Sequence, residues 1–265
     1  DELDDVPSSV FRQVSEIRFE LPFPHWVAGP MPATQQFLRL LPVASGRHYP
    51  ITLVDSSRDK RFDVWVLPDE RYVAGLGDWY RSVGLVIGAQ VTVKPIGDPG
   101  TFSIAVATNR GRRSEWVRSA SVVDGSLRLQ MQRATIPVRV DRSMMIDVPD
   151  TDAVVELRRQ ADSMAMPLGA LVRSAFAELA KLSGRGLAHA KSLYSAINLM
   201  RRTGAVSVFA ELTRNACFDP VGDGQWAYDK SLDGKVYHTA DEMRDRPLSN
   251  RDDLVKDQVI QYVGR

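Results

Sequence analysis

The sequence predicts an α+β protein with a small β-barrel in its N-terminal half and a helical domain that ends in a hairpin in its C-terminal half. Between residues 25 and 106, short apolar runs alternate with Gly/Pro/Asp turns, a spacing typical of a barrel. From Ala153 to Arg202, apolar residues recur at helical spacing instead. The acidic, proline-containing segment Asp147–Asp152 separates the two patterns, so we place the domain boundary near residue 148.

Composition indicates a soluble globular protein. The chain has 265 residues, of which 44% are hydrophobic and 25% charged, and it has no apolar run near the roughly 18 residues that a membrane span needs. Its single cysteine, Cys217, cannot form an internal disulfide, so we expect a reducing, cytoplasmic location and no membrane contact. The chain opens on the acidic run DELDDV, and we expect no signal peptide and a fragment of a longer protein.

Four regions are expected along the chain. They are an extended arm over residues 1–24 with a short strand at 16–21, a β-barrel domain with a hairpin over 25–147, a second domain over 148–228, and an acidic C-terminal tail with a terminal helix over 229–265.

The barrel domain contains five predicted strands, one turn of helix and a hairpin. The strands are expected at 36–41, 51–54, 62–67, 90–94 and 102–106. The glycine-rich stretch 75–84 predicts a turn of helix anchored by Trp79 and Tyr80. Asp124-Gly125 predicts a two-residue type I′ turn at the centre of a hairpin over 116–133. That register places Ala120, Val122, Leu127, Leu129 and Met131 on one face and polar side chains on the other.

The second domain is predicted to be a winged helix. A first helix starts at Ala153 with Thr151 or Asp152 as its cap, and Pro167 opens a second. A third runs from His189 to Arg202, a short helix or strand covers 208–212, and a hairpin over 217–228 forms the wing.

The third helix is predicted to carry a polar stripe. Lys191, Ser195, Asn198 and Arg202 fall at i, i+4, i+7 and i+11, opposite an apolar stripe that would face the core. Basic, hydroxyl and amide side chains on one exposed face are suited to reading a DNA duplex.

The distribution of charge supports the same function. The net charge is only +1, but residues 101–145 carry 8 Lys/Arg against 3 Asp/Glu, and residues 167–218 carry 7 against 2. Clustered basic residues are a footprint of phosphate contact, although a solvated surface would also account for them.

We therefore expect a non-catalytic protein that binds double-stranded DNA. Phosphate contacts are assigned to Lys191, Arg201, Arg202, Arg214 and the cluster of Arg110, Arg112, Arg113 and Arg118. Base contacts are assigned to Ser195 and Asn198, and Gln225 at the wing is expected to reach the minor groove.

The C-terminal half resembles the HARE-type winged helix. The resemblance covers roughly residues 165–228 and rests on Leu193-Tyr194-Ser195-Ala196-Ile197 and on the wing segment Phe218–Trp226, FDPVGDGQW. It implies DNA binding, as the recognition module of a larger bacterial regulatory or defence/restriction system, and the family is also linked to protein contacts. The short spacing between the third helix and the wing departs from the family's pattern.

The barrel segment resembles the seven-stranded DNA-binding pseudobarrels of plant transcription factors and some restriction enzymes. The residues that carry this resemblance are Phe62–Pro68, FDVWVLP, and Gly84–Val93, GLVIGAQVTV. It implies that the loops around Arg58, Lys60, Arg61 and Arg71 face the DNA groove.

Motifs for other chemistry are missing from the sequence. The four histidines are scattered, and there is no CxxC, HExxH, GxSxG or P-loop pattern, so no metal, cofactor or catalytic residue is expected. Two other functions remain open. One is a protein-interaction module that docks a partner or an additional catalytic domain, and the other is a barrel pocket for modified bases.

Overall fold

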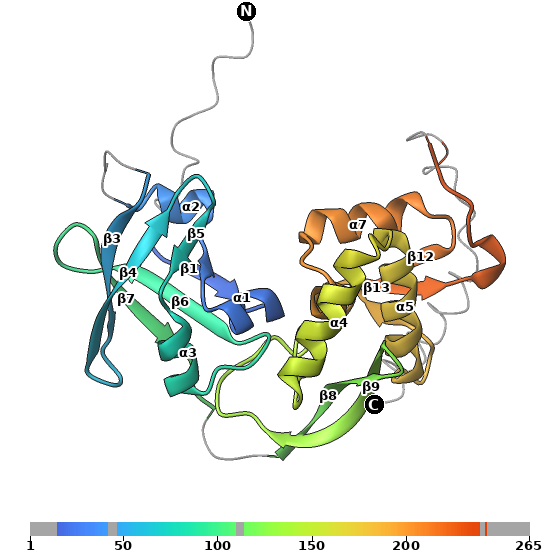
Figure 1. Cartoon of the computed structure of the whole chain (residues 1–265), viewed down its shortest axis with the longest axis horizontal. Helices are drawn as coiled ribbons and strands as arrows, with labels where there is room; N and C mark the ends of the chain where they lie inside the picture. Colours follow the sequence, from blue (N-terminus) through green and yellow to red (C-terminus); the bar gives the residue numbers. More distant parts are fainter. Residues whose placement is uncertain (1–14, 42–46, 110–113, 239–241, 243–265) are drawn as a thin grey trace, which may run out of the picture. The chain divides into compact units, whose positions relative to one another are not determined.

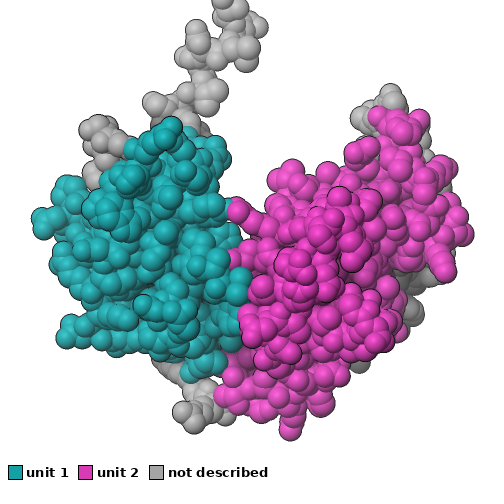
Figure 2. Space-filling view, viewed as in Figure 1, with its two compact units in different colours: residues 1–21, 25–112, 137–140 teal, residues 22–24, 113–136, 141–265 magenta. Residues whose placement is uncertain are grey.

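The computed structural model describes residues 15–41, 47–109, 114–238 and 242, and it has a mixed α+β architecture (Figure 1). The described residues divide into two compact units, coloured separately in Figure 2. Unit 1 takes its residues from 1–21, 25–112 and 137–140, and unit 2 from 22–24, 113–136 and 141–265.

Unit 1 is built on one seven-stranded sheet that curls into a half-barrel (Figure 1). The strand order is β1-β6-β7-β3-β4-β5-β2, in which β3 and β7 pair in parallel and the other neighbours pair antiparallel. The strands are β1 (Ile17–Glu20), β2 (Met31–Pro32), β3 (Tyr49–Asp55), β4 (Lys60–Leu67), β5 (Tyr72–Ala74), β6 (Gln90–Pro95) and β7 (Thr101–Val106). The accompanying helices are α1 (Phe23–Ala28), α2 (Gln35–Leu38) and α3 (Gly77–Val83).

The core of unit 1 forms from alternate residues of the strands and from α3. Leu53, Val64 and Val66 are fully buried, and Trp79 and Tyr80 of α3 join the same cluster. Helix α3 ends at Gly84, whose φ of 70° is the left-handed conformation that glycine adopts at helix ends. The strands predicted at 51–54, 62–67, 90–94 and 102–106 and the helical turn with its two aromatic anchors are therefore confirmed.

Of two predictions for the N-terminal region, one is wrong and one is confirmed. Residues 36–41 do not form a strand, because Thr34 accepts a hydrogen bond from the Phe37 backbone N–H at 3.2 Å and caps the short helix α2 instead. The short strand predicted at 16–21 is confirmed as β1, which pairs with β6 at an edge of the sheet.

Unit 2 combines four helices with two small sheets. One sheet has the order β10-β8-β9 and the other β11-β13-β12. The strands are β8 (Ser114–Val123), β9 (Ser126–Thr135), β10 (Ile146–Asp147), β11 (Ala188–His189), β12 (Phe218–Gly222) and β13 (Gln225–Tyr228). The helices are α4 (Thr151–Ser163), α5 (Leu168–Lys181), α6 (Ala190–Met200) and α7 (Ala205–Arg214), followed by a 3₁₀ turn at Lys230–Leu232.

The β8–β9 hairpin has the predicted register but belongs to a different domain from the one expected. Val122 pairs with Leu127 and Ala120 with Leu129, and Asp124 and Gly125 both have positive φ, as a type I′ turn requires. The hairpin was assigned to the barrel, yet it packs on α4 and α5 of unit 2. Its buried Leu127 is on the face that was predicted to be apolar.

The helices of unit 2 follow the predicted order with two differences. Asp150, rather than Thr151 or Asp152, caps α4 by accepting a hydrogen bond from the Ala153 N–H at 2.9 Å. The segment left open at 208–212 is the ten-residue helix α7. The helix that follows Pro167 and the hairpin within 217–228 are confirmed as α5 and β12–β13.

The terminal helix predicted in the tail falls among residues 243–265, outside the described residues. None of the helices in the described ranges combines the length and the apolar character needed to cross a membrane. Those ranges also contain no cluster of three or more His, Cys, Asp or Glu side chains able to hold a metal ion.

Candidate functional site

The middle of the polar stripe predicted on α6, Ser195 and Asn198, does not face solvent. Eight of the eleven residues of α6 are buried, because the helix packs against α4, α5 and α7. The assignment of Ser195 and Asn198 to base contacts is therefore wrong: they are 0% and 1% exposed. Both side chains instead satisfy buried backbone groups, as buried polar groups must.

Hydrogen bonds explain why these two polar residues lie in the core. The Ser195 hydroxyl donates to the Met144 carbonyl at 2.6 Å and holds the loop that precedes β10. Asn198 donates from Nδ2 to the carbonyls of Tyr194 and Thr203, at 2.9 and 3.1 Å. Its Oδ1 accepts from the Thr203 N–H at 3.1 Å, so the side chain closes the end of α6.

Lys191 and Arg201, predicted to contact phosphates, have partners within unit 2. Lys191 pairs with Asp141 at 2.6 Å, although its side chain remains about half exposed. Arg201 donates from Nη1 to the Met166 carbonyl at 2.6 Å. Both residues therefore also have structural roles.

Arg202, in the connection before α7, and Arg214, the last residue of α7, are both exposed. Between them, α7 buries Val208 and Leu212 and exposes Val206 and Phe209, which are 84% and 54% accessible. The sequence prediction missed this exposed face because apolar residues occur on both sides of the helix. The Phe209 ring meets Trp226 of β13 edge-on, with 5.9 Å between ring centroids.

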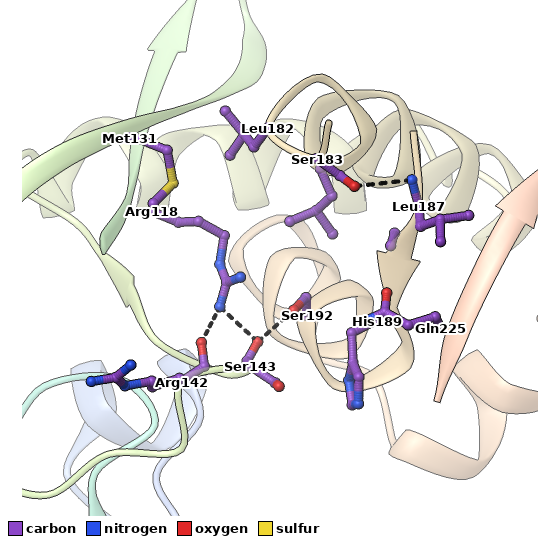
Figure 3. Close-up of a pocket in the computed structure, with 12 residues that line it drawn as sticks. Arg118, Met131, Arg142, Ser143, Leu182, Ser183, Leu187, His189, Ser192 and Gln225 are labelled. Carbon is purple, nitrogen blue, oxygen red and sulfur yellow. Dashed lines mark hydrogen bonds between the residues drawn. The ribbon is translucent and has the colours of Figure 1, made fainter. Parts of the chain in front are cut away.

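Arg118, predicted to clamp a DNA backbone, is instead held by carbonyl oxygens of its own unit. Its Nε donates to Met145 at 3.2 Å and its Nη2 donates to Ser143 at 2.9 Å and to Arg142. Figure 3 shows the guanidinium aimed at the loop that contains these carbonyls. Burial lowers the pKa of Arg118, and the negative charge of Asp141 opposes that effect. The other members of the predicted cluster, Arg110, Arg112 and Arg113, lie outside the described residues.

A pocket of about 340 Å³ brings Arg118 together with Gln225, two residues that the sequence singled out separately (Figure 3). It lies between β8 and β9, the end of α5, β11, the start of α6 and the start of β13. Polar lining comes from Arg118, Arg142, Ser143, Ser183, His189, Ser192 and Gln225, and apolar lining from Met131, Leu179, Leu182, Leu187 and Ala188. No sequence motif marks this set, since its members are spread over more than a hundred residues.

His189 lines the pocket and also caps α6. The Lys191 backbone N–H donates to His189 Nδ1 at 3.1 Å, so the neutral ring carries its proton on Nε2. Burial lowers the pKa of His189; Asp141 opposes this effect, and the positive charges of Lys191 and Arg118 add to it. Protonation of Nδ1 would remove the cap.

The lowered pKa of His189 predicts a loss of stability in mild acid. The neutral ring stabilises the folded state fully above the ordinary histidine pKa, and this contribution is lost as the pH falls through that value and then through the lower folded-state pKa. We expect the His189→Asn variant, which keeps a capping side chain but does not titrate, to lose less stability over this range. Urea unfolding of both proteins at several pH values measures the difference, and parallel pH profiles would contradict the prediction.

Comparisons of the chain with models of protein families, with curated proteins and with solved structures found no match.

Proposed function

We propose that the chain binds double-stranded DNA and that α7, rather than α6, is the helix that meets the duplex. The observation that carries this proposal is the order of elements in unit 2. A helix, a short strand, two helices and a hairpin follow one another as α5, β11, α6, α7 and β12–β13, and β11 pairs with β13. This is the order of a winged helix.

The connection between α6 and α7 supports the role of α7. The four residues Arg201–Gly204 separate the two helices and end in glycine, as in helix-turn-helix motifs. In such motifs the second helix enters the major groove. Ser207 and Ala210 are exposed on α7, and a hydroxyl and a methyl group can contact base edges and thymine methyl groups.

Basic residues flank the proposed reading helix. Arg202, in the connection before it, and Arg214, its last residue, are both exposed and keep the phosphate-contacting role inferred from the sequence. Gln225 lies at the start of β13, beside the Gly222–Gly224 turn at the wing tip. In unit 1, the seven strands of the half-barrel match the strand number expected from the resemblance to DNA-binding pseudobarrels, which supports the same function.

A salt titration tests the proposal. We expect the full chain to retain a labelled duplex in a gel-shift assay, with log K falling linearly against log salt at about −0.9 per phosphate contacted. The double variant Arg202→Ala/Arg214→Ala should reduce the magnitude of this slope by about 2, because each arginine accounts for roughly one contact. Arg159→Ala, on the exposed surface of α4, is the matched control. Absence of binding at low salt, or an unchanged slope in the double variant, would overturn the proposal.

The apolar surface of α7 favours a second function, a protein-interaction module. Val206 and Phe209 are exposed apolar side chains on α7. A helix that reads only polar base edges does not need such side chains, whereas a protein-binding surface does. The same assay separates the two functions. If α7 reads DNA, Val206→Ser/Phe209→Ser should weaken duplex binding, whereas unchanged binding would favour a protein partner on this helix.

A further inference from the structure

Arg118 is a partly buried cation that forms no ion pair with a carboxylate in the described part of the chain. Three backbone carbonyls accept hydrogen bonds from its Nε and Nη2. The negative charge of Asp141 acts on Arg118, but the Asp141 carboxylate forms its ion pair with Lys191. Charges removed from water are normally paired, because the loss of hydration is costly. The guanidinium edge that carries Nη1 forms no hydrogen bond with any described residue.

The neighbouring charges leave Arg118 as the unbalanced one. Arg142 pairs with Glu115 at 3.0 Å, and Lys191 pairs with Asp141 at 2.6 Å. His189 is neutral in its capping role. The pocket that Arg118 lines therefore has the electrostatic character of a site for a single negative charge.

The rest of the lining suits an apolar group next to that charge. Leu179, Leu182 and Met131 form one part of the wall. Two polar side chains of the lining, those of Ser183 and Gln225, are available to form hydrogen bonds with a ligand. The Ser183 hydroxyl oxygen accepts from the backbone N–H groups of Arg185 and Leu187, each at 3.3 Å, which leaves its own proton to donate. No described residue forms a hydrogen bond with the side-chain amide of Gln225.

We propose that this pocket binds a monocarboxylate with a small apolar body, whose carboxylate contacts Arg118 Nη1 and whose body packs on Leu179, Leu182 and Met131. A cavity of about 340 Å³ lies within the range of small-molecule sites, which are mostly apolar with a few placed polar groups. A doubly charged phosphate fits less well, because only Nη1 of Arg118 is available to bind it. The nearby cations Arg142 and Lys191 are already paired with carboxylates. This proposal does not depend on DNA binding.

The test uses benzoate and hexanoate as probes for the full chain, with acetate and inorganic phosphate as comparison ligands. We expect calorimetry to show binding of benzoate and hexanoate, weaker binding of acetate, which lacks the apolar body, and no binding of phosphate. The Arg118 Nε–Hε signal in a nitrogen–proton NMR spectrum should shift during the benzoate titration.

Two variants and a control link binding to the pocket. Arg118→Gln should weaken benzoate binding about tenfold or more, the change that accompanies loss of a hydrogen bond to a charged group. Met131→Trp should also weaken benzoate binding, because the larger side chain fills the pocket, while every charge stays in place. Met131 is 42% exposed, so the larger ring need not disturb the core. Arg133→Gln, on the same hairpin beside Trp116, should have no effect. No binding of either probe, unchanged binding in both pocket variants, or phosphate binding that depends on Arg118 would overturn the proposal.

Discussion

We expect the Asp55→Ala substitution to lower the free energy of unfolding of unit 1 by about 3–5 kcal/mol, because it removes the acceptor from a buried network. Asp55 ends β3 and is 1% exposed. Its Oδ1 accepts from the Ser57 N–H at 3.1 Å and from the Ser57 hydroxyl at 2.6 Å. Its Oδ2 accepts from Arg58 Nη1 at 3.1 Å and from the Trp79 indole N–H at 2.9 Å.

The Trp79 contact makes this loss large. Trp79 is 1% exposed, so its indole N–H cannot turn to water when Asp55 is removed, and a buried donor without an acceptor is costly. Arg58 is partly exposed and can be rehydrated, so it contributes less. The network ties the β3–β4 turn to α3 across 24 residues of sequence.

Asp63→Ala is the matched control for this prediction. Asp63 lies on the neighbouring strand, is exposed, and accepts one hydrogen bond, from the Thr52 hydroxyl at 2.8 Å. Urea unfolding followed by fluorine NMR of 5-fluorotryptophan reports unit 1 through Trp79 and unit 2 through Trp226. Equal losses for the two variants would show that the buried network contributes no more than a surface contact.

The same network predicts how unit 1 responds to acid. Burial raises the pKa of Asp55, but the hydrogen bonds from Ser57, Trp79 and Arg58 and the charge of Arg58 outweigh it and hold the pKa below its usual value. The ionised carboxylate therefore stabilises the fold above the ordinary aspartate pKa, and this stabilisation is lost as the pH falls through the lower folded-state value. Asp55→Ala should lack this part of the acid sensitivity.

Local signals in the sequence were sufficient for the hairpins and for most strands. Asp124-Gly125 specifies its turn through backbone conformation alone, and the strands around Leu53 and Val64 alternate buried and exposed residues within a few positions. Thr34 shows the limit of such signals, because one capping side chain converts a segment of strand-like composition into a helix.

The predicted DNA-reading stripe failed for a tertiary reason. Helical spacing shows which residues of α6 share a face, but it does not show how many neighbours the helix has. Three other helices contact α6, so the face that carries Ser195 and Asn198 is buried as well as the apolar face. The sequence could not predict the pocket, because Arg118 and Gln225 line the same cavity only when the β8–β9 hairpin is packed on α5.

Glu178 links the β8–β9 hairpin to α5, and Glu178→Ala is expected to loosen this contact. Glu178 is 5% exposed on α5. Its Oε2 accepts from the Leu129 N–H of β9 at 3.1 Å, and its Oε1 accepts from Arg128 Nη1 at 3.0 Å and from Lys181 Nζ. The Leu129 N–H is buried, whereas Arg128 and Lys181 are half exposed and can be hydrated when the carboxylate is removed.

We expect Glu178→Ala to lower the free energy of unfolding of unit 2 by about 2–3 kcal/mol, most of it from the unpaired Leu129 N–H and little from the exposed ion pairs. Glu178→Gln keeps an acceptor for Leu129 and should lose much less, which separates the hydrogen bond from the charge. Glu156→Ala, which removes an exposed carboxylate paired with Arg159, is the surface control and should change stability little. Urea unfolding measures the losses, and hydrogen exchange locates them: faster exchange in β8 and β9 is expected for Glu178→Ala alone.

The alanine variant should also bind benzoate more weakly than the glutamine variant. The reason is that Leu179 and Leu182 of the pocket wall follow Glu178 on α5, while Arg118 lies on β8. Equal exchange in the two variants would mean that apolar packing of Leu127 and Leu129 alone holds the hairpin in place.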